Sequence, residues 1–251
     1  MKISIHPPKK KKPSDNADFG FFLAGLVDSD GHFSKIPQLV ICFHEKSVFV
    51  PYFLRKKIGY GTISKLKNKR KVCFIISHSL GLERVCGLVH NKLQQFDKIT
   101  QYNTRLFSLK KFKLTENHSF SLRENSWFAG FFLGNGKFQI KIINNKSCRL
   151  PEVRVVIQID QKTDLLLLQI QKEFGGSVGK RLSQNTFYYS SVSFDSAKKL
   201  IQYFDRHQLM GVRHTEYLLW RKVCLKIQNK ETDIDFKWIC NVKKRMSLLK
   251  I

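Results

Sequence analysis

The sequence predicts an α+β fold with two pseudo-symmetric halves, each in the order helix, two strands, helix, two strands, helix (αββαββα). The first observation is a repeated motif, because FFLAGLVDSDGHF at 21–33 returns as WFAGFFLGNGKF at 127–138. The second is that the match continues downstream, where QLVICFHEKS at 38–47 corresponds to RVVIQIDQKT at 154–163. The third is that apolar residues alternate after each motif, as in half-buried strands. Repetition on this scale indicates two related units packed about a pseudo-two-fold axis.

Both motif copies are predicted to be helices that end at Gly31 and Gly136, because apolar runs follow polar capping residues and stop at glycine. Each copy contains an adjacent pair of small residues, at 24–25 and at 129–130. Small side chains let two helix backbones approach closely, so we expect the motif helices to pack against each other. Further strands are predicted at 72–78, 137–142, 154–160 and 188–194, and further helices at 82–97, 164–173 and 196–207.

Positive charge dominates the composition. The 251 residues include 45 Lys and Arg against 19 Asp and Glu, a formal net charge of +26. So large an excess favours a polyanionic partner, and nucleic acid, bound largely through counterion release, is favoured over an anionic membrane surface. The longest apolar runs are too short to span a bilayer, so no membrane association is expected.

The chain is predicted to divide into a basic N-terminal tail at 1–17, a first half at 18–113, a second half at 114–216 and a C-terminal basic extension at 217–251. The tail carries a lysine run at 9–12, which is interpreted as a disordered arm able to grip phosphate. Six scattered cysteines without Cys-x-x-Cys spacing are interpreted as buried thiols in a reducing compartment.

The segment LAGLVDSDG at 23–31 resembles the motif of the LAGLIDADG homing endonucleases, of the single-chain kind that carries two motif copies. The resemblance extends from about residue 18 to about residue 222. It implies that the motif helices pack at the interface of the halves, and that two antiparallel four-stranded sheets form a basic saddle in the major groove of DNA. It also implies that the last acid of each motif binds Mg²⁺, which activates water for phosphodiester hydrolysis.

The second motif copy departs from the family pattern at its acids. Asp30 is the surviving catalytic acid, and the ligand of any metal, whereas its partner position holds Asn135. The preceding acid, Asp28, corresponds to Leu133. An amide adds no negative charge to a site crowded by phosphates, so cleavage is expected to slow by orders of magnitude. Arg213 is the candidate for the basic residue that supports the chemistry in the second half.

Three functions are compatible with these residues. The favoured one is a cleavage-deficient protein, monomeric by itself, that binds structured RNA as an intron maturase or as a component of an organellar ribosome. The second is a DNA endonuclease or nickase that retains Mg-dependent hydrolysis through Asp30. The third, a scaffold for another protein, is disfavoured because protein interfaces are depleted in Lys.

The resemblance implies an organelle, a mitochondrion or a chloroplast, and the Phe-, Lys- and Ile-rich composition fits an AT-rich genome. Candidate nucleic-acid contacts are polar residues of the expected sheet faces and loops: His32, Lys35, Gln38, Lys65, Lys67, Arg70, Lys137, Gln139, Lys141, Arg154, Gln158, Lys180 and Arg181.

Overall fold

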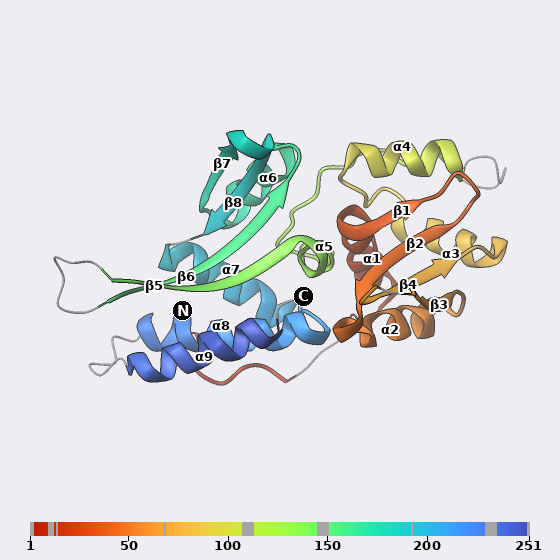
Figure 1. Ribbon diagram of the computed structural model, residues 1–251. Helices are drawn as coiled ribbons and strands as arrows, with labels where there is room; N and C mark the ends of the chain where they lie inside the picture. The colour runs from red at the N-terminus through yellow and green to blue at the C-terminus, as the bar shows by residue number, and fades with distance from the viewer. Residues whose placement is uncertain are drawn as a thin grey trace. The chain divides into compact units, whose positions relative to one another are not determined.

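The computed structural model describes residues 3–9, 13, 15–67, 69–106, 113–144, 151–191, 193–228 and 235–249. The chain forms two compact units, and each contains one four-stranded antiparallel sheet (Figure 1). We call residues 11–135 with 209–211 the N-terminal unit, and residues 1–10, 136–208 and 212–251 the C-terminal unit. This division follows packing, whereas the predicted halves at 18–113 and 114–216 follow the sequence repeat and stay a prediction.

The N-terminal unit contains both motif helices and the first sheet, in the strand order β1-β2-β4-β3. Its elements are α1 (Asn16–Asp30), β1 (Gly31–Phe33), β2 (Leu39–His44), α2 (Phe49–Ile58), β3 (Thr62–Lys65), β4 (Lys71–Ile76), α3 (Ser79–Val89), α4 (Phe96–Arg105) and α5 (Trp127–Asn135). Helix α1 begins where the Asp15 side chain accepts a hydrogen bond from the Asp18 amide, and it ends at Gly31 as predicted.

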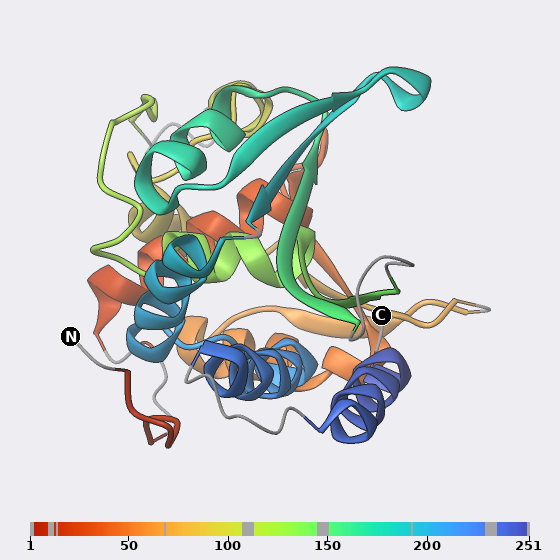
Figure 2. The same ribbon diagram turned by 90° about the vertical axis from the view of Figure 1, so that its left-hand side faces the viewer.

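The motif helices α1 and α5 pack side by side, as the small residues predict (Figures 1 and 2). A Cβ atom on Gly25 would lie 2.7 Å from the backbone nitrogen of Phe131. A Cβ atom on Gly130 would lie 2.9 Å from the carbonyl carbon of Phe22. Each glycine therefore touches the backbone of the opposite helix, and around this contact Phe22, Leu26 and Phe131 are fully buried.

The predicted helix at 82–97 is confirmed over 82–89 but is wrong as one continuous helix, because the structure has two helices there. Helix α3 ends at Val89, and α4 starts only at Phe96. Between them Asn91 adopts the left-handed region, with φ of 57°. Its amide donates to Thr115 Oγ1 over 2.8 Å, and its side-chain oxygen accepts from the Glu116 amide over 3.1 Å. These contacts with a distant segment hold the break, and a short polar side chain makes the left-handed conformation tolerable.

The C-terminal unit contains the second sheet, in the strand order β5-β6-β8-β7, and four helices among its described residues. Its elements are β5 (Gly136–Ile143), β6 (Glu152–Gln161), α6 (Leu165–Phe174), β7 (Ser177–Arg181), β8 (Thr186–Ser191), α7 (Phe194–Arg206), α8 (Gly211–Gln228) and α9 (Phe236–Leu249). One sheet face is apolar and packs on α7 and α8, where Phe138 contacts the rings of Phe204, Tyr217 and Trp220. The described residues of the C-terminal extension are almost all in helices, and α8 begins six residues before position 217, where the extension was predicted to start.

Residues 3–9 of the predicted tail are attached to the C-terminal unit. The Arg221 side chain donates to the Ser4 carbonyl over 2.8 Å, and Gln208 donates to the Lys9 carbonyl over 2.9 Å. The predicted disorder is therefore wrong for this part, because a buried arginine and a glutamine satisfy its backbone. Residues 10–12 of the lysine run lie outside the described residues. Within the described chain, helices with the length and apolarity to cross a bilayer are absent.

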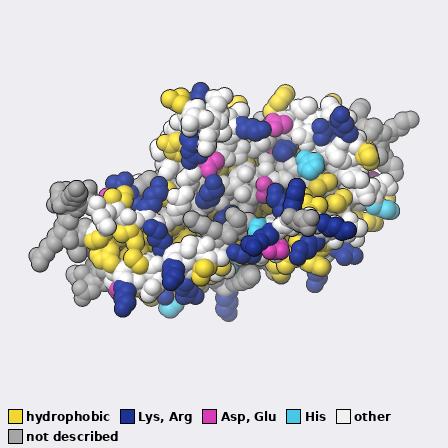
Figure 3. Space-filling model, viewed as in Figure 1, with side chains coloured by type: hydrophobic (Ala, Val, Ile, Leu, Met, Phe, Trp, Pro, Cys, Tyr) yellow, Lys and Arg dark blue, Asp and Glu magenta, His cyan; other side chains and the backbone are white. Residues whose placement is uncertain are grey.

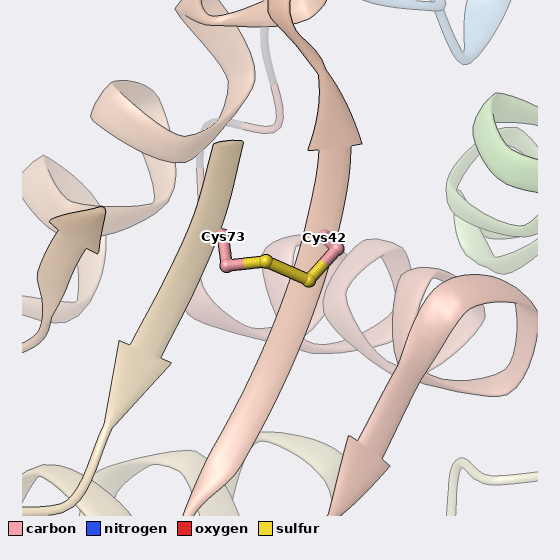
Figure 4. The surroundings of a disulfide bond; sticks show 2 residues. All are labelled: Cys42 and Cys73. Atoms are coloured by element: carbon pink, nitrogen blue, oxygen red, sulfur yellow. A yellow bond between two sulfur atoms is a disulfide. The ribbon is translucent and has the colours of Figure 1, made fainter. Parts of the chain in front are cut away.

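The interpretation of the cysteines as thiols is wrong for Cys42 and Cys73, which form a disulfide (Figure 4). These residues are direct partners in the β2–β4 ladder, so the antiparallel register brings their side chains together on one face. Cys86 and Cys224 are buried thiols as predicted, and Cys240 is an exposed thiol. Cys148 lies outside the described residues.

Candidate functional site

The ends of the two motif helices meet at Asp30, the last residue of α1. Its side chain is exposed, and its carboxylate lies against the end of α5. A Cβ atom on Gly134 would lie 2.7 Å from Asp30 Cγ and 2.8 Å from Ser29 Oγ. A side chain at position 134 would therefore push the Asp30 carboxylate out of this place. Asn135 follows directly as the half-buried last residue of α5, so the surviving acid and the end of the degenerate motif belong to one site.

Asp28, the other acid of the first motif, has a structural role. Its carboxylate is fully buried and accepts hydrogen bonds from the backbone amides of Gln94 (2.8 Å) and Gln95 (3.2 Å) and from the Trp127 indole (3.0 Å). Burial raises the pKa of Asp28 to about 7, although these hydrogen bonds and Lys98 act in the opposite direction. Asp28 thus joins the start of α4 to α5.

The role of Asp28 changes the meaning of Leu133. Because the first motif uses this position for packing, the missing acid at 133 does not indicate a lost metal ligand. Of the two departures from the motif, Asn135 is the one at the end of α5, next to the glycine that Asp30 lies against.

Basic side chains of α4 lie along the outer edge of β1, next to Asp30. Lys98 Nζ donates to the Gly31 carbonyl over 2.7 Å, and Arg105 donates to the Phe33 carbonyl. Gln101 Oε1 accepts from the Phe33 amide over 3.1 Å, so α4 satisfies backbone groups that an edge strand leaves unpaired. His32 is exposed on β1, and partial burial, Lys98 and Arg105 together lower its pKa. His32 is therefore neutral near pH 7.

Lys98 is a basic residue beside the end of α1 that the sequence reasoning did not name. A signal was present, because the downstream repeats are 116 residues apart (162 − 46 = 116). With the same offset, the first-half position that corresponds to Arg213 is 97 (213 − 116 = 97), and Lys98 follows it directly.

Arg213 itself is ion-paired within α8, in the C-terminal unit. Its Nη1 lies 2.5 Å from Glu216 Oε2, and the two side chains are 11% and 4% exposed. A carboxylate thus already compensates its charge, and the structure assigns Arg213 and Asp30 to different units.

The polar face of the second sheet gathers most of the candidate contacts of the second half. Alternation places Lys137, Gln139 and Lys141 of β5 on the same face as Arg154 and Gln158 of β6. Gln139 donates to Gln158 over 3.0 Å, and Arg154 pairs with Glu152 over 2.6 Å.

Asp160 organises the cations at one end of this face. It accepts from Lys137 over 2.9 Å and from Arg181 over 2.6 Å, and Arg181 also lies over the Tyr188 ring at 5.0 Å. Partial burial would raise the pKa of Asp160, but hydrogen bonds from Lys137, Gln158 and Arg181 together lower it. Lys180 lies on the other face of the sheet, where Phe187 is its cross-strand partner in the β7–β8 ladder. Since successive strand residues face opposite ways, Lys180 and Arg181 do not share one surface.

The face of the first sheet that carries Cys42 and Cys73 is different in character. Its central side chains are uncharged: Val40, Cys42, Thr62, Ser64, Cys73 and Ile75. The candidate cations lie outside it, with Lys35 exposed between β1 and β2 and Lys67 exposed between β3 and β4. Lys65 and Arg70 lie 3.5 Å and 3.9 Å from the Glu45 carboxylate. Gln38 is half-buried directly before β2. Figure 3 shows Lys and Arg side chains spread over the visible surface with few acids between them.

The side chains at Asp30 do not fit a divalent cation site built by the protein alone. Asp30 supplies one carboxylate and Asn135 a neutral amide. Across the part of the chain that the structure describes, no three His, Cys, Asp or Glu side chains are grouped closely enough to hold a metal ion. Mg²⁺ is usually bound through one or two carboxylates together with phosphate oxygens and water. Phosphate oxygens of a bound nucleic acid would therefore have to complete the coordination of an ion at Asp30.

Two helices packed through glycines, the first ending at an acid, together with two antiparallel four-stranded sheets, define the LAGLIDADG meganuclease fold. The LAGLIDADG endonuclease family model matches residues 128–224. A Schizosaccharomyces pombe protein named uncharacterized cox1 intron-2 37.2 kDa protein is 44% identical over 236 residues, which cover 90% of this chain and 72% of that protein. The chain belongs to the LAGLIDADG endonuclease family.

Two further similarities concern proteins that handle nucleic acid. The Saccharomyces cerevisiae intron-encoded RNA maturase bI4 is 29% identical over 144 residues, 54% of this chain and 20% of that protein. The structure of the I-LtrWI LAGLIDADG homing endonuclease bound to target DNA superposes with a TM-score of 0.73 at 17% identity, over 94% of this chain and all of that one. At this identity the structural match shows the fold alone.

Proposed function

We propose that this protein binds nucleic acid on a LAGLIDADG scaffold without efficient cleavage, and that its target is structured intron RNA. Asn135 is the observation that carries the proposal. The carboxylate of Asp30 lies against α5, whose last residue offers a neutral amide where the family pattern has an acid. Removing one preorganised charge of this kind typically costs about 3 kcal/mol of transition-state stabilisation, or roughly a hundredfold in rate. Binding of a polyanion depends on the net charge of +26, which this change leaves almost intact.

Three observations support RNA over duplex DNA. The centre of the first sheet face is uncharged, which leaves few side chains for bidentate contacts with bases in a major groove. Lys35, Lys67 and Arg70 lie in turns between strands instead, where they suit phosphate contacts across an A-form surface. The similarity to a protein named as an RNA maturase points the same way. The expected partner is an intron ribonucleoprotein rather than a ribosome, and the expected compartment is the mitochondrion, since a similar protein is named for a cox1 intron.

Under this proposal, the candidate contacts act mainly on phosphates. Lys67 and Arg70 in the turn between β3 and β4, and Lys137 and Arg181 around Asp160, are the groups that a phosphate would engage. Exposed ion pairs contribute little stability, so a phosphate can replace Glu45 beside Lys65 and Arg70 at small cost. Lys98, held at the Gly31 carbonyl, adds positive charge beside Asp30.

A second candidate function is a DNA nickase or endonuclease that depends on Asp30. The observation that favours it is the place of Asp30 against Gly134, because glycine there leaves room for the Asp30 carboxylate between the two helix ends. Lys98 in this function would stabilise developing charge on the leaving oxygen.

The test measures binding of the full chain to its host intron RNA and to the duplex spanning the intron insertion site, over a series of salt concentrations. We expect tighter binding to the RNA, with Lys67→Ala/Arg70→Ala lowering the slope of log K against log salt by about 1 to 2. The matched control is Arg55→Ala/Lys56→Ala on α2, which removes the same two side-chain types from exposed positions. Preferential binding to the duplex would overturn the RNA assignment, and equal slopes for the two variants would overturn the contact assignment.

A further inference from the structure

A cavity of about 640 Å³ lies in the C-terminal unit between residues 5–7, helix α8 and helix α9. The side chains that matter to its chemistry are Ile5, His6, Lys222, Leu225, Lys226 and Trp238. This volume is within the range of small-molecule sites in proteins. The cavity belongs to the C-terminal extension and the N-terminal segment, neither of which takes part in the repeat.

The wall formed by residues 5–7 is firmly built. The Arg221 side chain is 3% exposed and pairs with Asp205 over 2.8 Å. The same guanidinium donates to the Ser4 carbonyl over 2.8 Å and to the Ile5 carbonyl over 3.3 Å. A buried arginine fully satisfied by a carboxylate and backbone carbonyls fixes the segment against α8.

An aromatic ring and two ammonium groups form the opposite side of the cavity. Lys222 Nζ and Lys226 Nζ, one turn apart on α8, lie 5.5 Å and 5.1 Å from the centre of the Trp238 ring. Trp238 is partly exposed, whereas Trp127 and Trp220 are fully buried. The cavity thus combines a planar aromatic surface with positive charge, and His6 also lines it.

We propose that this cavity binds one unpaired nucleotide of a single-stranded nucleic acid, with the base stacked on Trp238 and the phosphate held by Lys222 and Lys226. The inference rests on the proposed nucleic-acid function and adds a contact for unpaired bases, away from the sheet faces. Two lysines select an anion, and an accessible indole face selects a planar group. A single nucleotide supplies both groups, because its phosphate is an anion and its base is planar.

A nucleotide base and the two lysine ammonium groups compete for the face of the Trp238 ring, and the base is expected to bind there more strongly. Base stacking on an aromatic side chain changes affinity by roughly five- to a hundredfold per base, whereas an exposed cation–π contact is the weaker of the two. A stacked base can therefore displace an ammonium from the ring face. The released ammonium then reaches the phosphate on the same nucleotide, so its charge remains compensated.

Tryptophan fluorescence tests the site directly, because Trp238 is the accessible member of the three tryptophans. We expect a short oligouridylate to quench the full-length protein, while a ribose-phosphate oligomer without bases does not. Trp238→Phe should lose the quenching but keep its affinity for a labelled oligouridylate within a few-fold. Trp238→Ala should weaken that affinity about tenfold. The corresponding oligodeoxythymidylate distinguishes RNA from DNA as the source of the nucleotide.

A pair of double variants separates a specific site from general charge. Lys222→Ala/Lys226→Ala should weaken oligouridylate binding more than Lys237→Ala/Lys244→Ala, which removes two exposed lysines of α9 outside the cavity. Equal weakening, or quenching that persists in Trp238→Phe, would overturn the site. If structured intron RNA still binds while the oligomer fails, the cavity assignment alone is wrong. If neither binds, the proposed function is wrong as well.

Discussion

Replacing Gly25 with alanine should strongly destabilise the N-terminal unit. The added Cβ would lie 2.7 Å from Phe131 N and 2.9 Å from the Trp127 carbonyl carbon, and both are backbone atoms of α5. A normal contact needs at least 3.4 Å, so the helices must separate by several tenths of an ångström or more. Separation opens a layer of fully buried Phe22, Leu26 and Phe131. Overpacking in a core costs about 1–3 kcal/mol, and a clash with backbone belongs at or above the upper end.

Chemical denaturation followed by circular dichroism measures this effect, with Gly87→Ala as the matched control. Gly87 lies exposed in α3, and a Cβ there meets nothing within 4 Å. The control should therefore be neutral or more stable by about 0.5–1 kcal/mol, as expected for alanine in a helix interior. If Gly25→Ala unfolds within about 0.5 kcal/mol of the control, the close packing of α1 on α5 is refuted.

Two further predictions concern groups whose roles the structure revealed. Asp28 has a pKa of about 7 in the folded protein, against an ordinary value of 3.8. Its contribution to the free energy of unfolding therefore falls by about 4 kcal/mol as pH rises from about 4 to about 7, at 1.36 kcal/mol per pH unit. Asp28→Asn should flatten the dependence of stability on pH over that range, and parallel profiles for the two proteins would contradict the burial of this carboxyl. The Cys42–Cys73 disulfide predicts two more titratable thiols in denatured protein after reduction than before, and a loss of about 2–4 kcal/mol in Cys42→Ser; an unchanged thiol count would show that the bond is absent.

Elements set by local pattern could be predicted from the sequence. The motif helices, their glycine ends and their mutual packing follow from apolar runs with small residues at 24–25 and 129–130, and the structure has all of them. Alternation after Gly136 likewise predicted β5 and the face that carries Lys137 and Gln139. These features need only the identity of near neighbours in the chain.

Features set by distant partners could not be predicted in the same way. Asp28 is held by amides 66 and 67 residues away and by an indole 99 residues away, so nothing near it in sequence separates it from Asp30. The break at Asn91 depends on residues 115 and 116, and the Cys42–Cys73 bond depends on the β2–β4 register. The cavity at Trp238 requires the chain's first residues to return to α8.

Cleavage of supercoiled DNA carrying the intron insertion site, in Mg²⁺ or Mn²⁺, tests the central claim most directly. The protein should bind without double-strand cutting, and Asn135→Asp should raise the cutting rate by roughly a hundredfold if the duplex is still recognised. Asp30→Asn in that background should abolish the gain. Efficient double-strand cutting by the unaltered chain would contradict the claim that an amide at 135 disables the site.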